Sequence, residues 1–192
     1  MQIPFTTDTL WHPIDACIPD LVQIVEDIQG RDYTFDKEIQ EVTSVSLSLQ
    51  KDPQEDVIVF NELYAEVQSH LNRISSIIVE MYREKAWWQK RQHTIKRLYL
   101  KARTLLLHTR NEIKALKNKE LQEAAIHEEI REVVDLKSII ENVIEDLELS
   151  IDMITVKRDE LDKANTNLSR QQKVLDTLVG LGYPVHARRE ME

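Results

Sequence analysis

The fold is decided by one stretch of the chain, which begins PQEDVIVFNELYAEVQSHLNRI (53–74) and ends LSRQQKVLDTLVG (168–180). Between Pro53 and Gly180 there is no other proline or glycine. These two residue types normally interrupt helices about every 10–20 residues. Apolar residues recur through the stretch at alternating steps of three and four, as in a long helix or a coiled coil. The stretch therefore predicts helix along nearly its whole length.

The apolar positions form a heptad-like seam. In chain order the seam is Leu63, Val67, Leu71, Ile74, Ile78, Met81, Trp88, Ile95, Leu98, Leu105, Ile113, Leu116, Leu121, Ala124, Ile130, Val133, Ile140, Val143, Leu147, Ile151, Ile154, Leu161, Leu168, Leu175 and Leu178. A single helix over this stretch would measure roughly 190 Å at about 1.5 Å per residue. A hairpin is expected instead, although continuous helices that pack between chains remain the alternative.

The turn of the hairpin is expected at Lys117-Asn118-Lys119-Glu120, the most polar interval near the middle of the stretch. A turn there gives arms of similar length, 54–117 and 121–179. Asn118 suits the turn because asparagine tolerates the left-handed backbone conformation. The sequence thus predicts an antiparallel pair of helices in which the two arms share one seam.

The remaining segments flank this hairpin. Residues 18–29 are expected to form a short helix with Pro19 in its first turn and Gly30 as its stop. Its apolar face is expected to consist of Leu21, Ile24, Val25 and Ile28. A second short helix is expected from about Asp36 to Leu49, although period-two alternation over 43–49 leaves a strand open. Asp52 and Pro53 are suited to begin the hairpin. The predicted fold is all-α, with a helical N-terminal region (1–52), the hairpin (53–180) and a short basic tail (181–192).

Composition limits the class of protein. The chain has 192 residues, of which 42% are hydrophobic and 31% charged. That apolar content is too high for a disordered chain. Cys17 is the single cysteine, so no disulfide forms within a monomer, which fits a reducing compartment. With no signal-peptide pattern and no long apolar run, a cytoplasmic protein without a membrane partner is expected, in the host cytoplasm if the chain is viral. A narrow seam also predicts a homo-oligomer.

Charge is strongly segregated along the hairpin. Residues 82–119, here called the basic block, contain Arg83, Lys85, Lys90, Arg91, Lys96, Arg97, Lys101, Arg103, Arg110, Lys114, Lys117 and Lys119. Only two carboxylates, those of Glu84 and Glu112, oppose these twelve cations, so the block carries a formal charge of +10. Because the chain totals −9, the rest of it carries −19.

The basic block also contains Tyr82, Trp87, Trp88 and Tyr99. Cations that neutralise phosphates and aromatic faces that stack on bases are the features that single-stranded nucleic acid requires. Nothing in the block resembles a base-reading recognition helix, so binding without sequence preference is expected. The candidate contacts are Arg83, Lys85, Lys90, Arg91, Lys96, Arg97, Lys101 and Arg103, with Trp87 and Tyr99 as the stacking candidates.

A second interpretation pairs the charges within the chain. If the hairpin turns near residue 119, the basic block faces roughly 120–157, which is rich in Glu and Asp. Opposite charges would then lie along the flanks of the seam, as at the e and g positions of coiled coils. The chain would in that case be a structural or adaptor protein of a larger assembly.

Catalytic and metal-binding patterns are absent from the sequence. The six histidines have no ligand-like spacing, either with one another or with Cys17. Three glycines are too few to build a phosphate-cradling loop, and no nucleophile motif is present. A protein that is not an enzyme and that needs no cofactor is therefore expected.

The order of these features resembles a known family. A basic, aromatic stretch (MYREKAWW, 81–88, then LYLKAR, 98–103) precedes an acidic helix, and a basic segment (SRQQK, 169–173) follows. This arrangement, over roughly residues 60–178, resembles bacteriophage recombination mediator proteins of the UvsY type. The resemblance implies a helical oligomer that binds single-stranded DNA. It also implies a role in loading a recombinase onto strands coated with single-strand-binding protein, and both proteins would then be partners.

Overall fold

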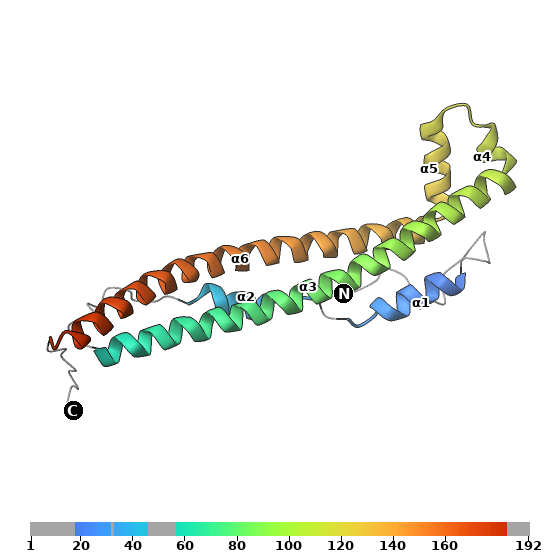
Figure 1. Ribbon diagram of the computed structural model, residues 1–192. Helices are drawn as coiled ribbons and strands as arrows, with labels where there is room; N and C mark the ends of the chain where they lie inside the picture. The colour runs from blue at the N-terminus through green and yellow to red at the C-terminus, as the bar shows by residue number, and fades with distance from the viewer. Residues whose placement is uncertain (1–17, 32, 46–56, 184–192) are drawn as a thin grey trace. The chain divides into compact units, whose positions relative to one another are not determined.

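The computed structural model describes residues 18–31, 33–45 and 57–183. Within these ranges the chain forms helices and no strand (Figure 1). The helices are α1 (Ile18–Ile28), α2 (Asp36–Thr43), α3 (Val57–Thr109), α4 (Asn111–Ala115), α5 (Lys119–Glu129) and α6 (Arg131–Gly180). The prediction of an all-α fold, with two short helices before a long helical hairpin, is confirmed.

The contacts divide the described residues into two units, and the long helices α3 and α6 run through both. The first unit, here called the charged unit, combines residues 18–31 and 33–34 with 83–148. The second, here called the apolar unit, combines residues 35–45 and 57–82 with 149–183. Each unit therefore joins part of the N-terminal region to part of the hairpin.

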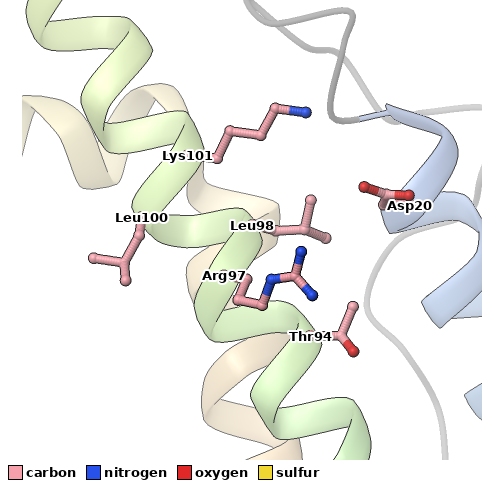
Figure 2. A pocket seen from close by; sticks show the side chains of 6 residues that line it. All are labelled: Asp20, Thr94, Arg97, Leu98, Leu100 and Lys101. Atoms are coloured by element: carbon pink, nitrogen blue, oxygen red, sulfur yellow. The ribbon is translucent and has the colours of Figure 1, made fainter.

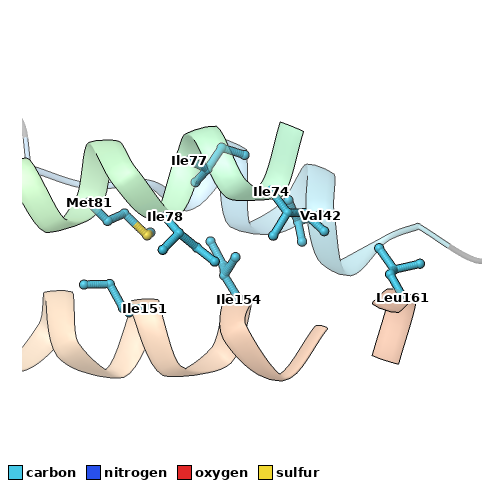
Figure 3. Packing of buried hydrophobic residues seen from close by; sticks show 8 residues of the cluster. All are labelled: Val42, Ile74, Ile77, Ile78, Met81, Ile151, Ile154 and Leu161. Carbon is cyan, nitrogen blue, oxygen red and sulfur yellow. The ribbon is translucent and has the colours of Figure 1, made fainter. Parts of the chain in front are cut away.

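In the apolar unit, α3 and α6 bury the predicted seam. Figure 3 shows one cluster, in which Val42 of α2 lies with side chains of α3 and α6 such as Ile74 and Ile154. A second cluster gathers Phe60, Val67, Leu168 and Leu175. Burial of each such side chain contributes about 1.5–3 kcal/mol, so these clusters are the main source of stability in this unit.

The antiparallel direction of α3 and α6 is fixed in the apolar unit by two hydrogen-bonded pairs of neutral side chains. The Tyr64 hydroxyl lies 3.0 Å from the Ser169 hydroxyl. One turn further along α3, Gln68 donates to Asn165 over 2.6 Å. As residue numbers rise on one helix they fall on the other, which is the antiparallel arrangement expected from the sequence.

In the charged unit, α1 presents the apolar face that was predicted. Leu21, Ile24, Val25 and Ile28 are all buried. Gly30 follows the helix with a φ of +77°, a left-handed conformation that favours glycine, so the expected stop is confirmed. On α3 the seam residue Trp88 is fully buried.

The chain leaves helix at residues 116–118, between α4 and α5, which overlaps the turn expected at 117–120. The arms on either side are not continuous helices, because α3 ends at Thr109 and α5 ends at Glu129, before α6 begins. Asn118 has a φ of −95° rather than a left-handed conformation, and its side chain caps α5 by accepting from the Glu120 backbone N–H. Leu121, assigned to the seam, is 56% exposed because α5 interrupts the two long arms.

The pairing between the arms lies close to the expected register. A turn at residue 119 would place Lys85 opposite Ile154 and Lys96 opposite Val143. Their ammonium groups pair with Glu148 at 2.9 Å and with Glu141 at 3.5 Å, six and two residues earlier. The expected pairing of the basic block with an acidic segment of the second arm is therefore present.

The second short helix is shorter than expected. α2 ends at Thr43. Ser44 and Val45 belong to neither helix nor strand, so neither the expected helix nor the alternative strand includes them. Four parts of the expected fold lie outside the described residues: residues 1–17 with Cys17, residues 46–49, the Asp52–Pro53 start of the hairpin, and residues 184–192 of the basic tail. At the other end of the hairpin, α6 stops at Gly180 as predicted.

Candidate nucleic-acid interface

The candidate residues fall on different sides of α3. One side of the helix, here called the basic face, is exposed along its length and consists of Arg83, Ala86, Lys90, His93, Arg97, Lys101, Thr104 and His108. Their steps of three and four residues place them on one side of a helix with 3.6 residues per turn. No carboxylate belongs to this face, since Glu84 and Glu112 are the acidic residues of the block and neither has this spacing.

Three cations of the basic face stand without a carboxylate partner. Arg83, Lys90 and Arg97 make no ion pair with any residue that the structure describes. They recur every seven residues and span about 21 Å along the helix axis at about 1.5 Å per residue. The basic face is therefore a continuous positive stripe on the solvent side of α3.

The other candidate cations are engaged within the charged unit. Lys85 pairs with Glu148 at 2.9 Å, and Lys96 approaches Glu141 at 3.5 Å, which joins α3 to α6. Arg103 binds Glu123 of α5 through two nitrogen atoms. Exposed pairs of this kind contribute about 0–1 kcal/mol each, so they orient the helices more than they stabilise them.

Trp87 lies in a cluster of cations and aromatic rings. The guanidinium carbons of Arg31 and Arg91 lie 4.0 Å and 3.7 Å from the centroid of its ring. Trp88 meets the same ring edge-on, with centroids 5.1 Å apart. Cations above an indole face are held by the ring quadrupole, so the stacking surface of Trp87 is already occupied by two guanidinium groups.

The two arginines over Trp87 are themselves held by carboxylates. Arg31 donates two hydrogen bonds to Glu84, at 2.6 Å and 2.7 Å, and Trp88 donates to the same carboxylate at 3.0 Å. Arg91 donates to Asp27 of α1 at 2.7 Å. These bonds connect α1, and Arg31 after its stop, to the first ten residues of the basic block.

Tyr99, the second stacking candidate, is also bonded within the unit. Its hydroxyl donates to Glu123 at 3.3 Å and lies 3.0 Å from the His127 ring nitrogen Nε2. The two rings meet edge-on at 5.9 Å. Burial, together with the nearby Glu123 carboxylate, raises the pKa of Tyr99 above its usual value. Tyr99 therefore belongs to the contact between α3 and α5.

The carboxylates that hold these cations have perturbed pKa values. The hydrogen bond from Arg91, supported by one from Gln23, lowers the pKa of Asp27 below its usual value. The hydrogen bond from Arg103 does the same for the pKa of Glu123. Both groups stay ionised down to lower pH than free carboxyl groups, because protonation would break a charge-assisted hydrogen bond.

An open pocket of about 430 Å³ adjoins the basic face within the charged unit (Figure 2). It is lined by Asp20 of α1 and by Thr94, Arg97, Leu98, Leu100 and Lys101 of α3. Figure 2 shows the Arg97 and Lys101 side chains directed to the side of α3 on which Asp20 lies, whereas Leu100 points to the other side. The pocket thus brings a carboxylate beside two of the candidate cations.

The role of α1 was not foreseen from the sequence. Asp20, Asp27 and Arg31 contact or adjoin the basic block, yet they lie 51 to 62 residues before its first residue, Tyr82. A signal did exist, because the segment 18–28 is acidic, with three carboxylates and no cation. An acidic amphipathic helix has a natural docking surface on a basic helix of the same chain, but the sequence does not say which face it chooses.

The residues that the structure describes contain neither a metal cluster nor a membrane-spanning helix. No group of three or more His, Cys, Asp or Glu side chains among them is placed to hold a metal ion. No helix in this part of the chain has the length and hydropathy of a membrane span.

The chain was also compared with known proteins. No protein-family model matches it, and neither a curated protein nor a solved structure shows significant similarity to it.

Proposed function

We propose that this chain is a non-enzymatic accessory protein that binds single-stranded DNA without sequence preference through the basic face of α3. The observation that carries the proposal is the row formed by Arg83, Lys90 and Arg97, which have no described ion-pair partner and lie on one exposed side of a helix. Unpaired cations at regular spacing are suited to phosphate groups, whose neutralisation releases condensed counterions.

The proposed contact set is smaller than the one expected from the sequence. Lys85, Arg91, Lys96 and Arg103 each have a carboxylate partner, and a phosphate would have to displace it. The rings of Trp87 and Tyr99 are likewise engaged, so base stacking on them would require the loss of existing contacts. Phosphate binding on the basic face requires neither change, and we assign the affinity to that face.

The more specific role rests on the resemblance to UvsY-type mediators. We infer that DNA held on α3 would be presented to a recombinase and exchanged with a single-strand-binding protein by an oligomer of this chain. A single basic stripe of about 21 Å contacts only a short length of strand. Several copies side by side would supply the extended track that loading a recombinase requires.

The test is fluorescence anisotropy with a labelled oligo-dT strand over a salt series. Each neutralised phosphate of single-stranded DNA contributes a slope of about −0.7 in log K against log salt concentration. Three contacts give a slope of about −2, or roughly a 40-fold weakening between about 50 and about 300 mM salt. The triple variant Arg83→Glu, Lys90→Glu, Arg97→Glu should abolish binding, with an unchanged circular dichroism spectrum.

A matched control changes the charge equally elsewhere. Lys114, Lys117 and Lys119 are exposed and have no described ion pair, and all three lie outside the basic face. Their replacement by glutamate should weaken binding far less than the first triple variant does. Equal losses from both variants would mean that only net charge matters, and the absence of wild-type binding at low salt would refute the proposal.

A second candidate function is a structural or adaptor coiled coil within a larger assembly. The observation that favours it is the internal pairing of Lys85, Lys96 and Arg103 with carboxylates of the second arm. If this is the only role of the charges, the triple variant of the basic face should keep its oligomer size in sedimentation. A variant that breaks the internal pairs, such as Lys85→Glu with Lys96→Glu, should change that size or lower the melting temperature.

A further inference from the structure

One side of α6 in the apolar unit, continued by Leu181, is exposed and carries a row of large apolar side chains. The row, here called the outer stripe, runs from Leu149 to Leu181 at alternating steps of four and three residues, and all of its positions are exposed. The Leu181 N–H donates to the Thr177 carbonyl over 3.0 Å, so the helical spacing reaches that residue. Half of the ten positions are large and apolar, with exposed fractions of 52–69%: Leu149, Met153, Val156, Val174 and Leu181.

The outer stripe lies on the side of α6 opposite the seam. Met153 and Val156 follow the seam residues Ile151 and Ile154 by two positions, which is about 200° around a helix of about 3.6 residues per turn. Exposed apolar side chains that occur singly need no explanation, whereas a contiguous row marks a contact surface. Steps of four and three are the spacing at which two helices pack along a common line. The outer stripe is therefore suited to a second helix.

The charges within the outer stripe indicate which helix that is. Between its apolar ends the stripe carries Glu160, Lys163 and Arg170. Two copies of α6 packed in parallel and in register would place each of these charges beside its own copy, and like charges in contact are unfavourable. Two antiparallel copies instead place Glu160 of one copy beside the basic part of the other, since residues 163–174 contain three cations and no carboxylate. A membrane surface is a poorer occupant, because these charges interrupt the apolar row.

We propose that two copies of this chain pack together through their outer stripes, with the two α6 helices antiparallel. In the register that we assign, Val156 faces Val174 of the second copy and Glu160 faces Arg170 of the second copy. Each pair occurs twice, because an interface with two-fold symmetry is self-complementary. This inference goes beyond the proposed function, since the contact between the copies requires no nucleic acid.

The apolar members of the outer stripe select this register. It places Leu149 against Leu181 of the second copy, in addition to the contact between the valines. Sliding one copy by one heptad in one direction places Met153 against Arg170, and sliding it in the other direction places Lys163 against one of the valines. Both of these registers bring a cation onto an apolar side chain, whereas the assigned one does not.

The charged groups of the assigned register are available for the contact. Arg170 makes no ion pair with any residue that the structure describes. Glu160 binds Lys157 at 3.3 Å through one carboxylate oxygen, and its other oxygen can accept from a second donor. The contact between the copies therefore displaces no interaction that the structure describes for these two groups.

Charge reversal tests the register in the full chain. Sedimentation equilibrium without nucleic acid measures the dissociation constant of the dimer. Glu160→Arg and Arg170→Glu each create two contacts between like charges, so each alone should raise that constant at least about 10-fold. The double variant restores opposite charges and should return to within about 3-fold of the wild type. Positions 160 and 170 lie about 15 Å apart along one helix at about 1.5 Å per residue, so such a rescue requires a contact between copies.

A control and a cross-link complete the test. Asp162→Arg reverses a charge on the same helix at an exposed position outside the outer stripe, and it should leave the dissociation constant unchanged. In a Cys17→Ser background, Val156→Cys together with Val174→Cys should form cross-linked dimers under oxidising conditions. Val156→Cys alone should form none, because the two copies of position 156 are far apart in the antiparallel arrangement.

Rescue by the double charge variant, together with cross-linking that needs both cysteines, supports the contact. A wild-type chain that stays monomeric overturns it, and the outer stripe then belongs to a helix of a different protein. Association that the single charge variants leave unchanged, or weaken without rescue by the double variant, overturns it as well. Cross-linking through Val156→Cys alone would mean that the copies pack in parallel. None of these results depends on strand binding, which the anisotropy titrations measure separately.

Discussion

The charged unit and the apolar unit are built on the same two long helices but hold them together differently. In the apolar unit, clusters such as Ile74 with Ile154 fill the seam, and neutral pairs such as Gln68 with Asn165 fix its register. In the charged unit the seam is flanked by ion pairs, among them Lys85 with Glu148 and Lys96 with Glu141. One continuous heptad pattern therefore supports two kinds of helix contact.

This difference shows that a block of charge in a sequence is not one functional surface. Lys85, Arg91, Lys96 and Arg103 form ion pairs inside the charged unit. Arg83, Lys90 and Arg97 have no described ion pair and face solvent on the basic face of the same helix. A helix exposes several sides at once, so neighbouring cations can have opposite roles. Arg91 binds a carboxylate of α1, whereas Lys90 beside it has no described partner.

The largest loss of stability is expected when Trp88 of the charged unit is truncated. Its side chain is fully buried in the charged unit, where it contacts Tyr33 and Trp87 and donates to Glu84. Trp88→Ala should lower the free energy of unfolding by about 3–5 kcal/mol, as large truncations in cores do. Hydrogen exchange should show the loss of protection mainly in residues 83–148.

A matched truncation in the apolar unit tests whether the two units unfold independently of each other. Ile154→Ala removes a fully buried side chain from the apolar unit and should cost about 2–5 kcal/mol. Its loss of protection should appear mainly in residues 57–82 and 149–180. If either variant reduced protection equally in both units, the two would unfold as one cooperative block.

A smaller effect is expected from Glu84, which has three hydrogen bonds to Arg31 and Trp88. Its side chain is only 14% exposed, so Glu84→Gln leaves a guanidinium group with a weaker partner in a partly desolvated place. Hydrogen bonds to charged groups contribute about 1.5–3 kcal/mol, and a loss of about 1–2 kcal/mol is expected in urea unfolding.

The control for Glu84 is the exposed pair of the apolar unit. Arg73 donates to Glu41 at 3.2 Å and 3.3 Å, with both side chains about half exposed. Arg73→Gln should produce no measurable change in unfolding, because water replaces an exposed partner at little cost. A loss as large as that of Glu84→Gln would mean that exposure does not govern these pairs.

The smallest effect concerns pH and should also differ between the units. The pKa values of Asp27 and Glu123 in the folded charged unit lie below their usual values of 3.8 and 4.5. A lowered folded-state pKa gives stability that is present above the usual value and is lost as the pH falls through the folded one. Thermal melts should therefore show the charged unit losing stability as the pH falls below about 4.

The double variant Asp27→Asn, Glu123→Gln checks the source of this pH dependence. It should be less stable than the wild type at neutral pH, and its melting temperature should change less between neutral pH and about pH 3. An unchanged pH slope in the double variant would assign the acid sensitivity to other carboxylates. In the apolar unit the described carboxyl group with a lowered pKa is that of Glu41, which bonds the exposed Arg73.

Most of the helical fold follows from local pattern. The apolar face of α1, the stop at Gly30 and the seam through Trp88, Ile95 and Ile154 were predicted because period and punctuation are properties of neighbouring residues. The end of α3 at Thr109 was not predicted, because no proline or glycine marks it. A helix can end wherever tertiary contacts favour another arrangement, and such contacts are not written in the local sequence.

The candidate site could be predicted only in part for the same reason. The identity of the basic block follows from composition, and the exposed side that bears Arg83, Lys90 and Arg97 follows from helical periodicity once the seam is known. The partners of Trp87 and Arg91 could not be predicted in this way, because Arg31 and Asp27 lie far from them in the sequence. The placement of Asp20 in the pocket likewise depends on how α1 docks.

The connection between α4 and α5 gives the hairpin a place where foreign sequence can be added. Lys117 and Asn118 are both exposed, and the side chain of Asn118 makes a single hydrogen bond, to the start of α5. Exposed connections with little backbone pairing are the sites where insertions succeed. An epitope or fluorescent probe inserted after Lys117 should therefore leave both long helices intact, and would allow the protein to be followed or immobilised without occupying either end of the chain.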